Sequence, residues 1–289
     1  MRREIESKLR CNHQGTARNY ATALNSFLCF CGGVELPVKR VAPVLIEEYA
    51  AWLTAKGVCN NTQSFYMRAL RAVYRRMVRE GLAIDLNPFA NVYTGVDKTR
   101  KRAISEAEML KIKELDLEGR DTMSFVRDMF MLSFYMMGIS YVDMAYLRKT
   151  DVTGGHIVYH RRKTGQRIAI GIVDKIQHII ARYPASERSP YLLPIITEPE
   201  TDTRRQYQNK LQQANKYLKI IAREAGVFTN ISTYTSRHTW ASIAKMKEIN
   251  IATISDALGH RNETTTRIYL ATLDNGYIDR ANELIIQNL

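Results

Sequence analysis

The sequence predicts a mainly α-helical protein of two domains with one small antiparallel β-sheet. The chain has 289 residues, which is about two domains of ordinary size. Apolar residues recur at intervals of three and four along most of it, the period of a helix face. Two short β-prone runs between residues 156 and 170 are the exception, and they predict the sheet.

Composition and charge narrow the function classes. Hydrophobic residues make up 45% and charged residues 25%, values that exclude a disordered, collagen-like or disulfide-stapled chain. The formal net charge of +13 favours a polyanionic partner. Residues 1–102 hold 17 basic and 8 acidic residues, so most of the excess lies in the first third. Nucleic acid is therefore the expected partner.

Neither a membrane span nor an export signal is expected. The uncharged run over residues 129–142 is shorter than the roughly 18 residues of a span, and we interpret it as a buried helix. The N-terminus has no apolar leader, which predicts a cytoplasmic protein. The four cysteines, all in the first third, form no paired metal framework. Free thiols are expected, and a zinc site that draws on His13 is the alternative.

Three helices are predicted in an N-terminal domain over residues 1–95. The first covers residues 16–30, and the second begins at Pro43 and ends before Gly57. The third covers residues 62–80, where an apolar stripe runs beside a basic one. We call the basic one the arginine stripe: Arg68, Arg71, Arg75 and Arg79. It is interpreted as a surface for DNA phosphates, and a solvated cationic face is the alternative.

A basic linker over residues 96–102 is predicted to join the two domains. Its cations are Lys98, Arg100, Lys101 and Arg102. The second domain, residues 103–289, begins with a capping box formed by Ser105 and Glu108. Helices are expected to dominate it, apart from a hairpin whose turn contains Lys163. The final helix is expected over residues 278–285.

Three clusters hold the residues of a chemical site. They read Tyr-Thr-Ser-Arg-His-Thr-Trp at 234–240, Leu-Gly-His-Arg at 258–261 and Thr-Thr-Arg-Ile-Tyr-Leu at 265–270. On these residues the sequence resembles the tyrosine recombinase (phage integrase) family. The family's second box reads His-x-x-Arg-His, its third reads Leu-Gly-His, and its nucleophilic tyrosine lies nine residues beyond that histidine. Arg237, His260 and Tyr269 keep this order and spacing.

The resemblance implies a fold and an activity. The fold is a helical, SAM-like core-binding domain followed by a mostly helical catalytic domain with a small antiparallel sheet. The activity is site-specific DNA recombination or integration through a covalent 3′-phosphotyrosyl intermediate, performed by a homotetramer on two DNA duplexes. Without DNA the chain could be a monomer. Lys163 matches the family's catalytic lysine between two strands.

Two positions depart from the family pattern. Ser140 stands at the arginine of the first box, and Tyr234 stands where the family has His or Lys. The combination resembles the integrases of Bacteroides-type mobile elements, which also lack the first arginine. Three arginines are candidates to replace it, and the two on the hairpin are favoured: Arg162 and Arg167, with Arg127 on a preceding helix as the third.

The residues suit strand cleavage without a metal or another cofactor. Tyr269 would attack the phosphorus, but a phenol is neutral at pH 7 and needs cationic neighbours or a base. Arg237 and His260 would bind the non-bridging oxygens, and Lys163 would protonate the leaving 5′ oxygen. The hydroxyls of Tyr234 and Ser140 could each donate a hydrogen bond. His238 and Trp240 are interpreted as structural or supporting residues.

Other functions remain open on the sequence. A type IB-like topoisomerase would use the same chemistry to relax supercoils. A catalytically degenerate, sequence-specific DNA-binding protein would explain Ser140. A basic helical scaffold is the third alternative. The apolar tail over residues 278–289 could pack on a neighbouring protomer or on its own domain.

Overall fold

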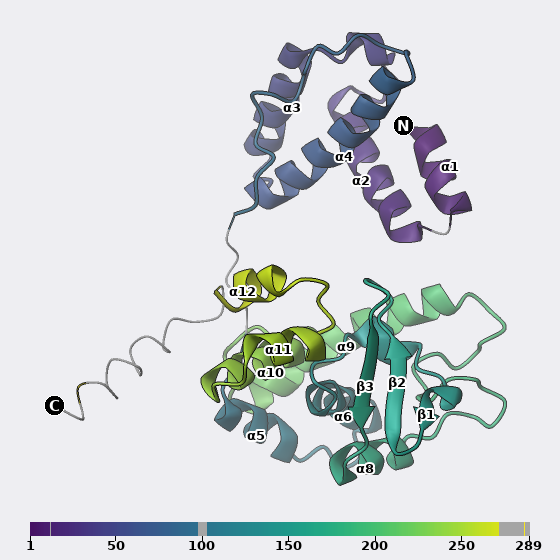
Figure 1. Ribbon diagram of the computed structural model, residues 1–289, viewed down its shortest axis with the longest axis vertical. Coiled ribbons are helices and arrows are strands. Elements are labelled where there is room, and N and C mark those ends of the chain that lie inside the picture. Colours follow the sequence, from purple (N-terminus) through teal and green to yellow (C-terminus); the bar gives the residue numbers. More distant parts are fainter. Residues whose placement is uncertain (12, 98–102, 272–285, 287–289) are drawn as a thin grey trace. The chain divides into compact units, whose positions relative to one another are not determined.

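Residues 1–11, 13–97, 103–271 and Ile286 are described by the computed structural model (Figure 1). They belong to two compact units, Met1–Lys98 and Thr99–Leu289. In the described ranges no helix is both long enough and apolar enough to cross a membrane. The linker cations Lys98, Arg100, Lys101 and Arg102 and most of the tail lie outside the described residues.

The first unit is helical, as predicted. Its elements are α1 (Arg2–Arg10), α2 (Gln14–Phe30), the 3-10 helix η1 (Val38–Arg40), α3 (Pro43–Ala55) and α4 (Asn60–Arg79). Helix α2 packs against α1, α3 and α4. The sequence did not predict α1, which is charged on most of its surface. An ion pair between Glu4 and Arg76, 2.8 Å apart, fastens it to α4.

Helix α4 is two-sided because its apolar and basic residues alternate with the helical period. Met67, Leu70 and Val73 are buried in the core of the unit, while Arg68, Arg75 and Arg79 are exposed. Tyr49 is fully buried beside this face, with its ring edge-on to Phe27 at 5.1 Å. Three of the four residues of the arginine stripe are therefore exposed on the side of α4 away from the core, and Arg71 is half-buried.

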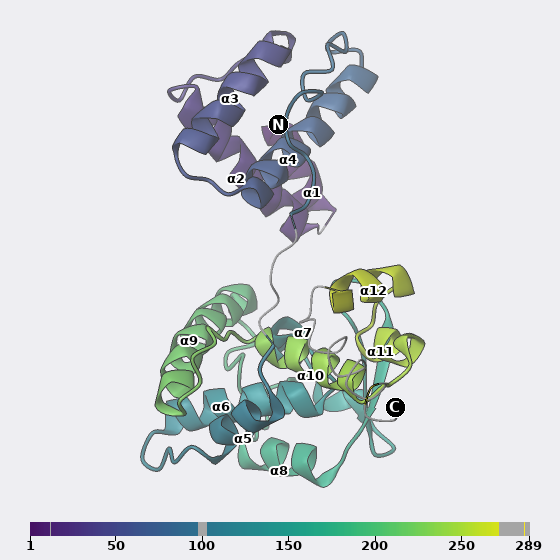
Figure 2. The ribbon, with the colours of Figure 1, turned by 90° about the vertical axis from the view of Figure 1, so that its left-hand side faces the viewer.

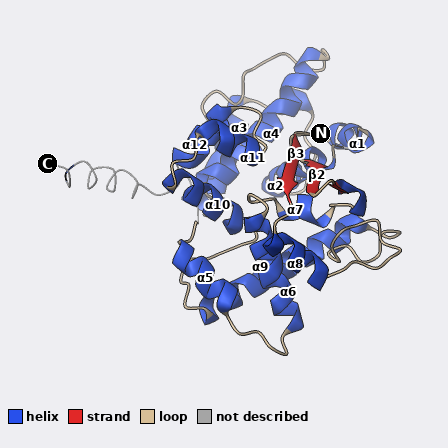
Figure 3. Ribbon diagram, turned by 60° about the horizontal axis from the view of Figure 1, so that its bottom comes forward, coloured by secondary structure: helices blue, strands red, loops and turns tan. Residues whose placement is uncertain are grey.

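The second unit places a small sheet at one side of a helical body (Figures 1 and 3). Its helices are α5 (Glu106–Glu114), α6 (Asp121–Tyr135), α7 (Tyr141–Ala145), η2 (Lys149–Asp151), α8 (Asp174–Arg182), α9 (Thr203–Glu224), α10 (Thr235–Met246), α11 (Ile251–Ala257) and α12 (Glu263–Ala271). The strands β1 (Val152–Thr153), β2 (His156–His160) and β3 (Arg167–Gly171) pair antiparallel in the order β1-β2-β3. The predicted fold class is confirmed.

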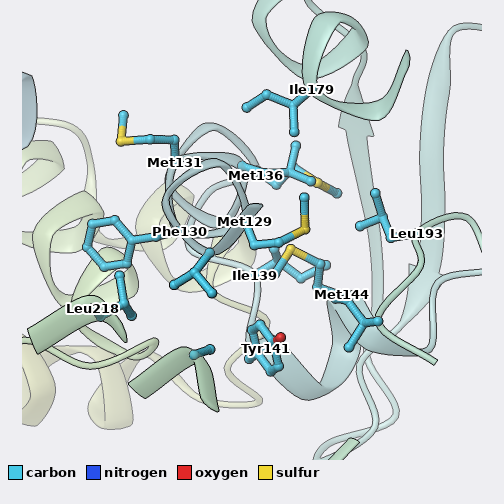
Figure 4. Close-up of a cluster of buried hydrophobic side chains, with 14 of the residues drawn as sticks. Met129, Phe130, Met131, Met136, Ile139, Tyr141, Met144, Ile179, Leu193 and Leu218 are labelled. Atoms are coloured by element: carbon cyan, nitrogen blue, oxygen red, sulfur yellow. The ribbon is translucent and has the colours of Figure 1, made fainter. Parts of the chain in front are cut away.

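Helix α6 is the centre of the second unit and packs against α5, α8, α9 and α10 (Figure 2). Met129 and Leu132 are almost completely buried, and Figure 4 shows Met129 and Phe130 among the side chains of the surrounding core. Ser133 ties α6 to α10, since its hydroxyl lies 2.6 Å from that of Ser236. At the start of the unit, the capping box predicted for Ser105 and Glu108 is confirmed.

The single buried helix predicted over residues 129–142 is wrong. Helix α6 ends at Tyr135, and α7 begins at Tyr141. Between them Met137 and Gly138 have φ angles of 53° and 72°, which reverse the chain. A side chain at Gly138 would place its Cβ 2.8 Å from the Cα of Arg237. The break therefore lets the chain pass directly against Arg237. The hydrophobic pattern of residues 129–142 does not reveal this contact, so it could not predict the break.

Candidate active site

The three sequence clusters meet on the second unit. Helix α10 carries Arg237 and His238, the loop after α11 carries His260, and α12 carries Tyr269. The Tyr269 ring lies 5.3 Å from the His238 ring in a stacked arrangement and 5.9 Å from the His260 ring, edge-on. Residues separated by up to 32 positions in the sequence thus form one cluster because α10, α11 and α12 pack together.

Tyr269 is half-buried, and burial raises the pKa of its hydroxyl above the ordinary value. The neighbouring Tyr234 raises this pKa further, whereas Arg237 and Arg161 lower it. The two arginines thus favour the phenolate, the form that a nucleophile must reach.

Arg237 is buried, with 2% of its surface exposed. Its Nη1 donates to the carbonyl of Gly138 at 2.8 Å, and its Nη2 donates to the carbonyl of Leu258. Its Nε has no hydrogen-bond partner within the described residues. Burial lowers the pKa of this guanidinium, but arginine stays charged in proteins. The two carbonyls fix its plane and leave donor capacity for a further acceptor.

His260 is neutral at pH 7 because its pKa is lowered to about 4. Burial is the main cause, followed by the nearby positive charges of Arg237, Arg161 and Lys163. Its Nδ1 lies 2.8 Å from the hydroxyl of Thr266. When Thr266 donates this bond, the imidazole carries its proton on Nε2 and can donate it to an anion.

Lys163 lies in the turn between β2 and β3, where the sequence placed it, and is exposed. The turn is hydrogen-bonded to the loop that carries His260. The Thr164 hydroxyl donates to the Gly259 carbonyl at 3.3 Å, and the Arg261 Nε donates to the Thr164 carbonyl at 3.0 Å. Lys163 therefore lies on the same assembly as His260, whose pKa it lowers.

Ser140 is engaged in a local structural role. It is the N-cap of α7, and its hydroxyl donates to the Asp143 carboxylate at 2.6 Å. The other carboxylate oxygen of Asp143 accepts a bond from the backbone N–H of Arg162 at 2.8 Å. A neutral side chain that is already hydrogen-bonded supplies no charge to the cluster around Tyr269.

The three arginines predicted as substitutes have other surroundings. The Arg162 guanidinium lies 4.0 Å from the centre of the Tyr146 ring, and Arg167 is exposed on β3. Arg127 binds the Asp128 carboxylate at 2.9 Å and the Leu115 carbonyl at 2.8 Å. No contact in the described chain brings any of the three to Arg237, His260 or Tyr269.

Arg161, which the sequence analysis did not single out, lies in the cluster instead. It is 5% exposed, and its Nη1 donates to the Gly259 carbonyl at 2.8 Å. Its charge lowers the pKa values of Arg237, His260 and Tyr269. Like Arg237, it has an Nε without a partner within the described residues. The sequence offered one indication that Arg161 belongs to the site, namely its position directly after β2 and two residues before Lys163.

Comparison with known proteins places this cluster in a family. Residues 121–275 match the model of the phage integrase family, and residues 1–95 match that of the phage integrase SAM-like domain. The chain belongs to the phage integrase family. The first match covers more than half of the chain and includes Arg237, His260 and Tyr269.

Relatives and solved structures agree with this family. A tyrosine recombinase of Pseudothermotoga lettingae is 26% identical over 279 residues, which cover 92% of this chain and 90% of the relative. A lambda integrase(75-356) dimer bound to a COC′ core site has the same fold, with a TM-score of 0.67, 17% identity and coverage of 89% and 88%. A lambda integrase tetramer bound to a Holliday junction has a TM-score of 0.67 and 16% identity, and the match covers 91% of this chain and 72% of that chain.

The remaining site predictions for this phage integrase concern DNA and metal binding. Arg71 is half-buried and donates to the Thr94 hydroxyl at 3.3 Å. Among the described residues, no carboxylate pairs with Arg68, Arg75 or Arg79. The described part of the chain also contains no group of three metal-binding side chains, and its cysteines are free.

Proposed function

We propose that the chain is a site-specific DNA recombinase that cleaves a strand with Tyr269 and rejoins it through a covalent 3′-phosphotyrosyl intermediate. The observation that carries this proposal is the pair of buried guanidiniums, Arg237 and Arg161, near the Tyr269 hydroxyl. Neither has a carboxylate partner in the described chain. Because a buried cation without a counter-charge is costly, the cluster suits an anion such as a DNA phosphodiester.

Each neighbour of Tyr269 then has a role in transferring the phosphoryl group. Arg237 and His260 donate hydrogen bonds to the non-bridging oxygens, where negative charge grows in the transition state. The Tyr269 oxygen forms a bond to phosphorus as the bond from phosphorus to the 5′ oxygen breaks. Lys163 gives that oxygen a proton, and its exposed position on a turn suits a group that reaches the substrate. Because side chains supply the charge, we expect no metal requirement.

Arg161 supplies the positive charge that the first box lacks. It is buried beside Arg237, whereas Arg162, Arg167 and Arg127 are bound elsewhere or exposed. Two guanidiniums can hold two non-bridging oxygens in bidentate geometry. Ser140 keeps a structural role at the start of α7. Tyr234, with 40% of its surface exposed at the start of α10, is proposed to donate its hydroxyl to the phosphate.

The first unit is proposed to bind duplex DNA through the arginine stripe, with the linker cations adding phosphate contacts. Exposed guanidiniums spaced along one helix face can follow a phosphate backbone. Lambda integrase is seen as a tetramer on a Holliday junction, and we propose the same assembly for this chain on two duplexes, with monomers in the absence of DNA. The tail over residues 278–289 would then pack on a neighbouring protomer.

The biological setting is proposed from Ser140 and Tyr234. The combination resembles the Bacteroides-type branch, in which the first arginine is likewise absent, so we propose that the chain integrates a mobile element and acts on DNA in the cytoplasm, at the nucleoid. Sequencing genomic DNA trapped on the protein would identify the element. Fragments without a common junction sequence would contradict this setting.

A nicked suicide substrate tests the proposed chemistry. The nick releases the leaving strand, so cleavage by the wild-type protein should accumulate a covalent protein–DNA adduct, also in EDTA. Tyr269→Phe should abolish the adduct and leave DNA binding unchanged. Binding without any adduct would support the degenerate DNA-binding protein, and supercoil relaxation without strand exchange would support the topoisomerase.

A further inference from the structure

We infer that His238 is a catalytic residue of this site, the general base that takes the proton of the Tyr269 hydroxyl during strand cleavage. The inference rests on the proposed function. The sequence alone assigns His238 a structural or supporting role, and Tyr234 occupies the position four residues earlier where the family has His or Lys.

The contact between the two side chains carries the inference. Nδ1 of His238 lies 2.5 Å from the Tyr269 hydroxyl oxygen. The two rings are stacked, with planes inclined by 25° and centres 5.3 Å apart. A neutral imidazole with its proton on Nε2 presents Nδ1 as an acceptor, and the phenol then donates to it. The hydroxyl that must lose a proton is thus already paired with a nitrogen that can receive one.

Helix periodicity places His238 beside Tyr234. Residues four apart lie on the same helix face, and Tyr234 and His238 are neighbours at the start of α10. Their rings meet edge-on with centres 5.0 Å apart. One turn further along α10, an imidazole still faces the nucleophile. The family's second box has a histidine at both positions, so the departure at Tyr234 leaves the imidazole of His238 in the site.

The surroundings of Tyr269 make a base necessary. Burial and Tyr234 raise the pKa of its hydroxyl, and the opposing effect of Arg237 and Arg161 does not reverse that. His260 is poorly suited to the task. Its Nδ1 is paired with Thr266, and its proton affinity is low because its pKa is about 4. Lys163 is assigned to the leaving oxygen at the opposite end of the reaction.

The proton and electron pairs balance in both directions. In cleavage the Tyr269 proton moves to Nδ1 of His238, and the phenolic oxygen forms its bond to phosphorus. The 5′ oxygen leaves with the electron pair of the broken bond and takes a proton from Lys163. In rejoining, the 5′ hydroxyl returns its proton to Lys163 and attacks phosphorus, and the imidazolium of His238 protonates the departing phenolate.

The test measures single-turnover cleavage of the nicked substrate by two variants. His238→Asn retains a hydrogen-bond acceptor close to Nδ1 but is no base, and His238→Phe retains only the ring. Both should cleave about 100- to 10,000-fold more slowly than the wild type. His156→Asn is the matched control, because His156 is an exposed histidine at the other end of β2 from the hairpin turn. It should cleave at the wild-type rate.

A second substrate separates the base from the acid. When sulfur replaces the bridging 5′ oxygen, the thiolate leaves without a proton, so Lys163→Ala should recover most of its lost rate. His238→Asn should stay slow on this substrate, and added imidazole should partly restore His238→Ala. Wild-type cleavage by His238→Asn would overturn the inference and leave the proposed function intact. Rescue of His238→Asn by sulfur would also overturn it. Absence of a wild-type adduct would instead contradict the proposed function.

Discussion

Nη1 of Arg161 donates to the carbonyl oxygen of Gly259 across 2.8 Å and 98 residues of sequence. This bond joins the end of β2, which leads into the turn of Lys163, to the loop that presents His260. It also holds the Arg161 guanidinium inside the cluster, where its charge acts on Tyr269. One buried side chain therefore both positions two proposed catalytic groups and adds a charge to their site.

Substituting Arg161 should impair cleavage more than substituting its neighbours on the hairpin. We expect Arg161→Ala to cleave the nicked substrate about 100- to 1,000-fold more slowly, the scale of a lost oxyanion-hole donor. Arg162→Ala is the matched control and should remain close to the wild type, as should Arg167→Ala and Arg127→Ala. If one of these three variants lost most of its cleavage rate while Arg161→Ala stayed active, that arginine, and not Arg161, would supply the charge that the first box lacks.

Gly259 should tolerate a side chain less well than Gly165. Both glycines have positive φ angles, 60° and 72°. A Cβ at Gly259 would lie 2.8 Å from Ile168 Cδ1 and 3.0 Å from Arg161 Cδ, whereas a Cβ at Gly165 would meet nothing within 4 Å. Backbone strain is common to both alanine variants, so the clash should destabilise Gly259→Ala by about 1–3 kcal/mol more. Urea unfolding measures this difference, and equal midpoints would contradict it.

Acid should destabilise the wild type partly through His260. Its pKa is about 4 in the folded protein and 6.5 in the reference state, so the unfolded chain binds the proton first as the pH falls. Folding stability is therefore lost between about pH 6.5 and 4. A His260→Gln variant lacks this titration, and its stability should fall less steeply over that window. Parallel pH profiles from chemical denaturation would show that His260 does not contribute.

The arginine stripe should determine part of the salt dependence of DNA binding. Each phosphate contact adds about one unit to the slope of log K against log salt concentration. Arg68→Ala/Arg75→Ala should therefore lower the slope by about two. Arg76→Gln is the control on the same helix, because Arg76 is already paired with Glu4 and Glu80. An unchanged slope in the double variant would contradict the DNA-binding role and support the alternative, that the arginine stripe is a solvated cationic face.

The sequence predicted the parts of the fold that depend on local patterns. Helical periodicity located α2, α3 and α4, and the β-prone runs located the hairpin of Lys163. The Ser105 capping box was readable because it needs only two residues at a fixed spacing. By contrast, the turn at Gly138 exists because the chain passes against Arg237, and that contact joins residues 99 apart.

The same distinction applies to the site. Arg237, His260 and Tyr269 could be named because their spacing matches the family boxes. Arg161 could not, since its burial depends on the packing of the hairpin against the Gly259 loop. The Tyr269 contact of His238 likewise requires α10 and α12 to pack together. Residue type and spacing identify the chemistry, whereas tertiary packing decides which neighbours take part.

The position of the covalent bond tests the central claim most directly. After cleavage of the suicide substrate and nuclease digestion, trypsin should release the peptide that follows Arg267, which contains both Tyr269 and Tyr277. Fragmentation of this peptide in the mass spectrometer should place the remaining nucleotide on Tyr269. A nucleotide on Tyr277 or on any other residue would contradict the account.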